Sequence, residues 1–214
     1  VFPSRKSIGE IVGIPKDKIR VITHYLGGGF GCKLSLWSHA VLAVLATRHV
    51  KRPVKLVLKR TQMFGPVGFR PSTIQNVSLG TSKDGKLTFI KHLSVNETSM
   101  FRDFTEYATE PTQIMYACPN MVTGVKAAAL NIGSPTWMRA PGDAPGSFAP
   151  ESAMDELSYA LSIDPIELRL LNYAEKDPEN GLPWSSKSLR ECYKEGAKLF
   201  HWDKRNPKAT SMKN

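Results

Sequence analysis

A glycine-rich segment, Gly27-Gly28-Gly29-Phe30-Gly31-Cys32-Lys33, is the first part of the sequence that could do chemistry, and we call residues 27–33 the glycine loop. It stands between a strand predicted over residues 20–23 and an apolar helix predicted over residues 36–48. Glycines let backbone N–H groups approach a ligand closely, and the start of a helix favours negative charge. One interpretation is therefore an anionic ligand bound by the backbone. The other is a tight turn whose Phe30 fills the core.

The glycine loop matches neither of the common phosphate-binding motifs. A Walker A loop needs glycine directly before its lysine and Ser or Thr directly after it, whereas Cys32 and Leu34 flank Lys33. The dinucleotide spacing G-x-G-x-x-G fails as well, because its third position falls on Cys32 or Leu34. The sequence therefore argues against a mononucleotide or dinucleotide loop at this place.

A second segment, Thr136-Trp137-Met138-Arg139-Ala140-Pro141-Gly142, carries one arginine among bulky and turn-forming residues, and we call residues 136–142 the arginine loop. An arginine in such surroundings either pairs with a carboxylate or faces an anionic ligand. Asp143 and Glu151 are the carboxylates that could pair with it. Both interpretations of Arg139 are open at this point.

The positive charge of the chain is concentrated near its N-terminus. The formal net charge is +10, and residues 1–60 hold twelve Lys or Arg against only Glu10 and Asp17, which accounts for the whole excess. Such a region either attracts an anionic partner or is a solvated face. Its cations are not interleaved with aromatic residues, which disfavours nucleic acid as the partner. No run of about 18 apolar residues occurs, so the sequence predicts no membrane-spanning helix.

The elements that must position the two loops indicate an α+β fold, with a mixed sheet, helices packed on one side and a helical C-terminal segment. Strands are predicted over residues 20–23, 54–58, 73–80, 86–96 and 121–131, with Asp84-Gly85 as a hairpin turn. Residues 133–147 are expected to form a loop rich in Gly and Pro. Cys32, Cys118 and Cys192 are too few and too scattered for a disulfide framework or a closed zinc site, and we interpret them as reduced thiols.

Helices are predicted from apolar spacing and from capping residues. Ser4 is expected to cap a helix that ends at Gly13, and residues 36–48, apolar almost all round, to form a buried helix. Met154, Leu157 and Leu161 share one helical face, Asp164-Pro165 begins the next helix, and Leu189 to Phe200 forms the last. We divide the chain into residues 1–134, residues 135–203 with the arginine loop and the helical segment, and a tail, residues 204–214, with nothing to bury.

Taken together, these motifs are similar to the molybdenum-binding subunit of the xanthine dehydrogenase/aldehyde oxidase family of molybdenum hydroxylases, and most closely to its aldehyde oxidoreductase branch. They occur in the family's order and at about its spacing over essentially the whole chain. The residues that carry the resemblance are the glycine loop, Arg60-Thr61-Gln62-Met63-Phe64, Arg70-Pro71, Met138-Arg139-Ala140-Pro141-Gly142, Glu151, Ala153-Met154-Asp155-Glu156-Leu157 and Asp164-Pro165-x-Glu167-x-Arg169-x-x-Asn172.

The resemblance implies a reaction, a cofactor and partners. Family members hydroxylate an aldehyde or an aromatic heterocycle with oxygen from water, at a molybdenum centre held by the dithiolene of molybdopterin. The pterin is either the plain form or its cytosine dinucleotide. Electrons leave through an iron–sulfur subunit and an FAD subunit, whose clusters and flavin are the other cofactors. The location is cytoplasmic or periplasmic.

The resemblance also assigns roles to residues of this chain. Phe30 and Gly31 are expected beside the molybdenum, and Arg139 in the pocket for substrate and cofactor. The cofactor-binding set it implies is Gly28, Gly29, Phe30, Gly31, Met138, Arg139, Ala140 and Arg169, and no side chain is expected to ligate the metal. For Arg169, an ordinary surface ion pair is the alternative. These roles require the glycine loop and the arginine loop to meet around one cavity.

Two departures from the family pattern shape the expected function. Purine-oxidising members carry a Glu directly after the lysine of the glycine loop, where this chain has Leu34, so an aldehyde substrate is expected. The family's general base is a Glu in a later segment that has no counterpart here. We therefore expect a central fragment of the subunit that does not turn over aldehyde alone. The competing hypothesis is a non-catalytic module whose basic residues 1–60 bind an anionic partner.

Overall fold

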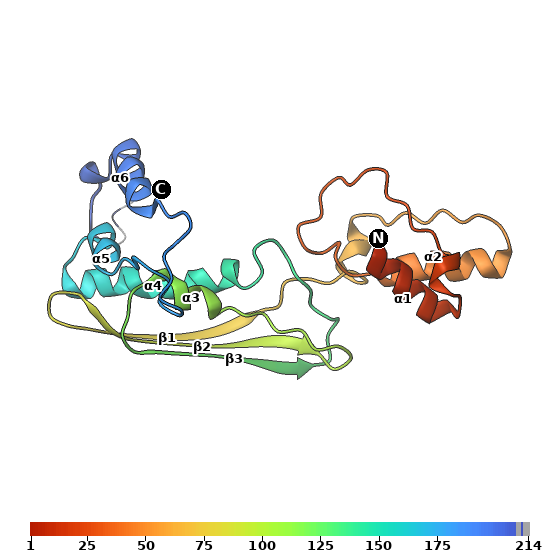
Figure 1. Ribbon diagram of the computed structural model, residues 1–214, viewed down its shortest axis with the longest axis horizontal. Coiled ribbons are helices and arrows are strands. Elements are labelled where there is room, and N and C mark those ends of the chain that lie inside the picture. The colour runs from red at the N-terminus through yellow and green to blue at the C-terminus, as the bar shows by residue number, and fades with distance from the viewer. Residues whose placement is uncertain (209–210, 212–214) are drawn as a thin grey trace. The chain divides into compact units, whose positions relative to one another are not determined.

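The computed structural model describes residues 1–208 and residue 211, and this part of the chain forms six α-helices and three β-strands (Figure 1). Of the predicted tail, residues 204–214, the structure describes residues 204–208 and residue 211, and the rest lies outside the described residues. Short 3-10 turns occur at Lys16–Lys18, Thr61–Phe64 and Trp202–Lys204. The helices are α1 (Phe2–Val12), α2 (Ser38–Val50), α3 (Glu110–Met115), α4 (Asp143–Leu161), α5 (Pro165–Leu171) and α6 (Leu189–Phe200).

The three strands β1 (Thr73–Thr81), β2 (Leu87–Ser99) and β3 (Met121–Leu130) form one sheet in the order β1-β2-β3. β1 and β2 make the predicted hairpin, and its turn contains Gly85 with a φ of +88°. β2 and β3 run parallel, because Ile90 N–H donates to the Asn120 carbonyl and Met100 N–H to the Leu130 carbonyl, at 2.9 and 3.2 Å. The sheet is therefore mixed, and the predicted α+β fold class is confirmed.

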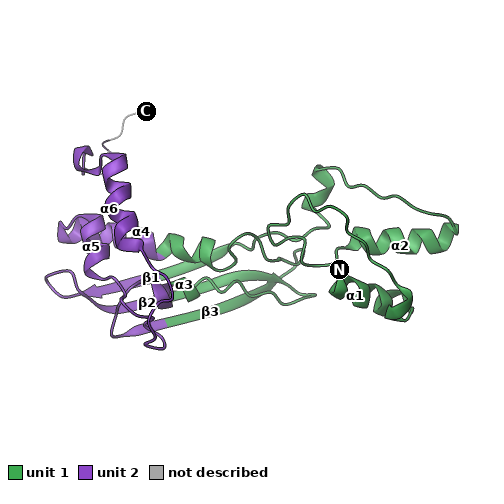
Figure 2. Cartoon of the chain, turned by 45° about the horizontal axis from the view of Figure 1, so that its top comes forward, with its two compact units in different colours: residues 1–76, 92–111, 123–149 green, residues 77–91, 112–122, 150–214 purple. Residues whose placement is uncertain are grey.

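The described chain divides into two compact units, each discontinuous in sequence (Figure 2). Unit 1 comprises residues 1–76, 92–111 and 123–149, and unit 2 comprises residues 77–91, 112–122 and 150–214. Both the glycine loop and the arginine loop belong to unit 1, and α5 and α6 belong to unit 2. The sequence-based division at residues 134 and 203 stays a prediction.

The apolar core of unit 2 lies where the start of β2 meets helices. Its buried members are Leu87, Ile90, Tyr116, Met154 and Leu168, with Leu157 and Leu161 packed against them. The predicted apolar face of α4 is thereby confirmed. The predicted start of α5 is confirmed too, because the Asp164 carboxylate accepts hydrogen bonds from the N–H groups of Ile166 and Glu167, and Pro165 occupies the first turn.

In unit 1, α1 ends at Gly13 as predicted, with the left-handed φ of +68° that glycine adopts readily. The helix begins earlier than predicted, at the N-cap Val1, so Ser4 lies inside its first turn rather than at its cap. α2 also differs from the prediction, because none of its residues is buried and Leu42 is 56% exposed. One link to α1 is a 2.6 Å hydrogen bond from Arg48 to the Val12 carbonyl.

Two further predictions are wrong in informative ways, and the prediction of the last helix is confirmed. Residues 20–23 and 54–58 form no strand, because no segment of the described chain pairs with their backbone groups. The predicted loop over residues 133–147 is shorter, since α4 already begins at Asp143. α6 forms where predicted, yet it buries none of its residues.

Candidate functional site

The glycine loop holds Phe30 on the surface in a conformation that side-chain-bearing residues rarely adopt. Phe30 has a φ of +49° and is 64% exposed, so the interpretation of Phe30 as a core residue is wrong. Its ring lies over Gly28, where an added Cβ would be 2.8 Å from the ring. The turn is closed by hydrogen bonds from Leu34 N–H to the Gly31 carbonyl, at 3.0 Å, and from the Trp37 indole to the Cys32 carbonyl, at 2.6 Å.

The arginine loop shows the same kind of backbone strain. Ala140 has a φ of +54° and Gly142 one of +78°. The Trp137 ring packs edge-on against Phe104 with ring centroids 5.5 Å apart, and Thr136 N–H donates to the Phe69 carbonyl at 2.9 Å. Left-handed residues that carry a side chain persist only where surrounding contacts hold them, and they are frequent at functional sites.

The two loops meet, although about a hundred residues separate them in the sequence. A Cβ on Gly31 would lie 2.5 Å from the Trp137 carbonyl oxygen and 3.0 Å from Met138 Cα. Only glycine allows this backbone approach, and the φ of +90° at Gly31 adds a second reason for glycine. The structure thus brings the glycine loop and the arginine loop into backbone contact at Gly31, and that they enclose one shared cavity stays a prediction.

The Arg139 side chain is exposed, and within the described residues it forms no ion pair. The alternative pairing with Asp143 or Glu151 is therefore not what the structure shows. A guanidinium without a carboxylate partner, on a strained loop beside Phe30, remains available to an anionic or carbonyl-bearing ligand.

Behind the arginine loop lie two residues to which the sequence assigned no role. Arg70 Nη1 is 3.0 Å from a Glu106 carboxylate oxygen, and that same oxygen accepts a 2.5 Å hydrogen bond from Gly142 N–H. Arg70 was visible only as part of the Arg70-Pro71 motif. Glu106 follows a strand in an unremarkable stretch, and no local signal could have identified it.

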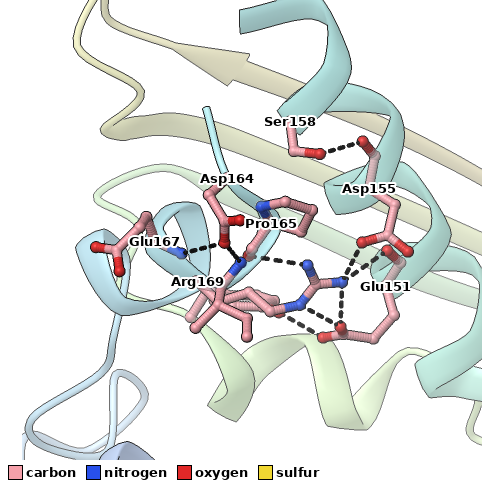
Figure 3. A network of polar contacts seen from close by, with 9 residues as sticks. Glu151, Asp155, Ser158, Asp164, Pro165, Glu167 and Arg169 are labelled. Carbon is pink, nitrogen blue, oxygen red and sulfur yellow. Dashed lines mark hydrogen bonds and ion pairs between the residues drawn. The ribbon is translucent and has the colours of Figure 1, made fainter. Parts of the chain in front are cut away.

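Arg169, the remaining residue of the predicted set, lies in unit 2 and is engaged by carboxylates. Its guanidinium is 2.7 Å from Glu151 and 2.8 Å from Asp155, and the Tyr116 hydroxyl donates to Glu151 (Figure 3). Burial, aided by the Glu151 charge, raises the pKa of Tyr116 well above its ordinary value. This geometry favours the ion-pair alternative, with Arg169 itself buried and its two carboxylate partners partly exposed.

The donor set near the two loops fits an organic anionic cofactor better than a directly ligated metal. In the described part of the chain, no three His, Cys, Asp or Glu side chains are grouped as metal ligands, and all three cysteines are free. A molybdopterin is anionic through its phosphate, and the exposed Arg139 and the glycine backbone suit such a group. No described helix is both long and apolar enough to cross a bilayer.

Residues 1–173 match the family model of the molybdopterin cofactor-binding domain, and the chain belongs to that family. The resemblance to the xanthine dehydrogenase/aldehyde oxidase family is thereby confirmed. The chain is 40% identical over 203 residues to the aldehyde oxidoreductase molybdenum-binding subunit PaoC of Escherichia coli K12. It is 30% identical over 208 residues to the putative xanthine dehydrogenase molybdenum-binding subunit XdhA of the same strain. In both cases the match covers 94% of this chain and 28% of the relative.

Solved structures with the same fold agree with this assignment. The aldehyde oxidoreductase of Desulfovibrio gigas superposes with a TM-score of 0.78 at 27% identity, covering 92% of this chain and 22% of that one. Quinoline 2-oxidoreductase from Pseudomonas putida 86 superposes with a TM-score of 0.83 at 20% identity, over 94% of this chain and 27% of that one. The second likeness supports the fold alone.

Proposed function

We propose that this chain forms one wall of the molybdopterin site of an aldehyde-oxidising molybdenum hydroxylase. The observation that carries the proposal is the contact of Gly31 with the backbone of Trp137 and Met138. This contact places an exposed phenyl ring and an arginine loop side by side in unit 1. Molybdopterin, when bound, supplies the redox chemistry that hydroxylates the aldehyde carbon with oxygen from water.

Within this proposal each loop has its own task. Gly28, Gly29 and Gly31 let the backbone come close to the cofactor, and Phe30 forms a wall beside the reacting aldehyde. Arg139 offers its guanidinium to an anionic oxygen of the cofactor or to the substrate carbonyl, and Met138 and Ala140 shape the loop that presents it. Arg169 is assigned to the ion pair that joins α4 to α5.

The proposed substrate is an aldehyde rather than a purine. Leu34, which follows Lys33 in the sequence, is 67% exposed and offers no carboxylate to hydrogen-bond a heterocycle. The name of the E. coli relative at 40% identity, an aldehyde oxidoreductase subunit, points the same way. We propose that electrons pass to an iron–sulfur subunit and an FAD subunit, and that the pterin is the plain form or its cytosine dinucleotide.

Retention of the pterin tests the proposal. The chain is produced in cells that make the cofactor, and pterin and molybdenum are counted per purified chain. Gly31→Ala, which pushes a Cβ into the Trp137 carbonyl, is expected to lower the retained pterin at least about tenfold. Gly196→Ala is the matched control, because a Cβ at Gly196 meets nothing within 4 Å. Equal pterin contents in the wild type and Gly31→Ala would overturn the proposal.

We also propose that the 214-residue chain alone does not turn over aldehyde. The carboxylate that the described residues hydrogen-bond to the arginine loop is that of Glu106, and its Oε1 is already engaged by Arg70 and by Gly142 N–H. Aldehyde-dependent reduction of an artificial electron acceptor by the loaded chain is expected to stay at the background level. Molybdenum-dependent oxidation of aldehyde by the chain would contradict this part of the proposal.

The competing function, a basic module for an anionic partner, is favoured by the concentration of cations in residues 1–60. It predicts binding to unrelated duplex DNA that weakens steeply as salt rises, because released counterions supply the affinity. Binding of that kind, together with no retained pterin, would favour the module over the cofactor-binding wall.

A further inference from the structure

The backbone of the arginine loop is held by an ion pair between the half-buried Arg70 and the buried Glu106. We propose that Arg70 and Glu106 together are positioning residues, which fix the backbone of residues 139–142 so that Arg139 is presented at the site. The inference rests on the proposed function in one respect, namely that Arg139 faces a cofactor or substrate. The contacts themselves are independent of any cofactor.

The pair contacts both the carbonyl groups and an N–H group of the loop backbone. Arg70 Nη2 donates a hydrogen bond to the carbonyl of Arg139, and Nη1 lies 3.5 Å from the carbonyl of Ala140. Glu106 Oε1 accepts from Gly142 N–H at 2.5 Å and from Arg70 Nη1 at 3.0 Å. One guanidinium thus satisfies the loop's carbonyls, and one carboxylate oxygen satisfies its N–H, while the two side chains neutralise each other.

Burial makes each member of the pair depend on the other. Glu106 is 1% exposed, and its second oxygen has no hydrogen-bond partner among the described residues. A buried carboxylate is costly unless a cation and hydrogen-bond donors compensate for it, and Arg70 is the cation that does so. Lysine could not replace Arg70, because a single ammonium group cannot reach two carbonyls and a carboxylate in the fixed geometry of a guanidinium.

The position of Glu106 is itself set by a buried side chain of β2. Asn96 Oδ1 accepts from Glu106 N–H at 3.3 Å, and Asn96 Nδ2 donates to the Phe104 carbonyl at 3.0 Å. Phe104 in turn packs on Trp137 of the arginine loop. A rigid strand therefore supports the pair, and the pair supports the loop, which is how a strained loop is held in a single conformation.

The Arg139 side chain depends on this support, because it forms no ion pair within the described residues. Its place therefore follows from the backbone of the loop. Ala140, the next residue, has the left-handed φ of +54°. Without Arg70 and Glu106, the loop would lose the contacts that oppose this strain and would sample other conformations.

Hydrogen exchange and trypsin cleavage on the purified chain test the inference without any cofactor. The first variant, Arg70→Lys, keeps the positive charge but loses the guanidinium. The second, Glu106→Gln, loses the negative charge but keeps an oxygen that accepts from Gly142 N–H. The third, Glu106→Ala, loses both the charge and the acceptor. Arg190→Lys is the matched control, because Arg190 pairs with Glu175 on the surface of unit 2. Far-UV circular dichroism confirms that each variant is folded.

We expect Arg70→Lys and Glu106→Ala to accelerate exchange of the Gly142 amide and trypsin cleavage after Arg139 by roughly tenfold to a hundredfold, since charged hydrogen bonds are lost. Glu106→Gln is expected to keep most of the protection that Glu106→Ala loses at Gly142. A purely global loss of stability would not produce this difference at Gly142. In a further variant, Arg70→Ala, which removes the guanidinium, millimolar guanidinium is expected to restore part of the lost protection. Arg190→Lys is expected to match the wild type.

Two results would overturn the inference. One is unchanged exchange at Gly142 in folded Arg70→Lys and Glu106→Ala. The other is the same acceleration at amides of α6 as at Gly142, which would mean general destabilisation. Because no pterin is present, failure of these measurements leaves the pterin-retention test intact, and failure of pterin retention leaves the loop measurements intact.

Discussion

The buried residues of β2 differ in chemistry between the two parts of the strand. In unit 2 the strand buries Leu87 and Ile90, whereas in unit 1 it buries His92, Ser94, Asn96 and Thr98. In this second part the usual pattern of apolar burial is reversed, because the apolar Leu93 and Val95 are exposed between the buried polar residues. One strand therefore serves an apolar core along its first part and a hydrogen-bonded support along its second.

The difference follows from what each half must hold. The apolar half packs against Met154 and Leu168, and non-directional burial is enough to fix helices on a strand. The polar half holds irregular backbone, whose N–H and carbonyl groups need partners when they are buried. Thr98 Oγ1 accepts from Phe104 N–H at 2.8 Å, and the Ser99 and Ser134 hydroxyls are 2.7 Å apart. The polar residues thus fix loops that an apolar face could not fix.

The largest expected effect is on the apolar half. Leu168→Ala leaves a cavity at a fully buried position, and we expect it to lower the free energy of unfolding by about 2–5 kcal/mol. Leu199→Ala on α6 is the matched control, because Leu199 is 79% exposed, and its effect is expected within about 0.5 kcal/mol. Urea unfolding followed by circular dichroism measures both, and equal losses would refute the apolar core.

A smaller effect on stability, with a different location, is expected in the polar half. Asn96→Ala leaves the Phe104 carbonyl and the Glu106 N–H without partners, which costs about 1–3 kcal/mol. Exchange at residues 104–106 and at Gly142 should accelerate before unit 2 loses protection. Asn76→Ala, at an exposed position of β1, is the control. If Asn96→Ala weakened both units alike, the proposed division of labour along β2 would be wrong.

The smallest effect is a dependence on pH that belongs to the polar half alone. Burial lowers the pKa of His92 below its ordinary value of 6.5. The unfolded chain therefore binds the proton more readily, so the contribution of His92 to stability is fully present above its ordinary pKa and is lost as the pH falls below that value. His92→Gln is expected to reduce this decline below about pH 6.5, with wild type and variant compared by urea unfolding. Parallel declines in the two proteins would exclude His92 as the cause.

Local signals predicted the elements that local chemistry determines. Asp84-Gly85 marked the hairpin, Asp164-Pro165 marked the start of α5, and the spacing of Met154, Leu157 and Leu161 marked the face of α4. Each of these depends on residues within one or two turns of the chain. The sequence also located both loops of the site, because glycine, proline and an isolated arginine are conspicuous there.

What sequence patterns could not predict depends on partners distant in the chain. Residues 20–23 and 54–58 have strand-like composition, yet a strand exists only where a neighbour supplies its hydrogen bonds. The apolar composition of α2 predicted burial, but burial depends on what packs against a helix. Alternation along residues 86–96 gave no sign that His92 and Asn96, rather than Leu93 and Val95, face inward. Glu106 is recognisable only once Gly142 is seen beside it.

The left-handed conformations of Phe30 and Ala140 have a practical consequence for anyone who collects variants of this chain. Each costs roughly 1–2 kcal/mol, and neighbouring contacts must oppose that cost. A substitution that weakens those contacts lets the two residues relax to an unstrained conformation. The strain energy released in this way offsets part of the stability that the substitution removes. Such a protein would melt at nearly the usual temperature although its two loops had separated. A screen that ranks variants by thermal shift would therefore keep many in which the glycine loop and the arginine loop no longer meet.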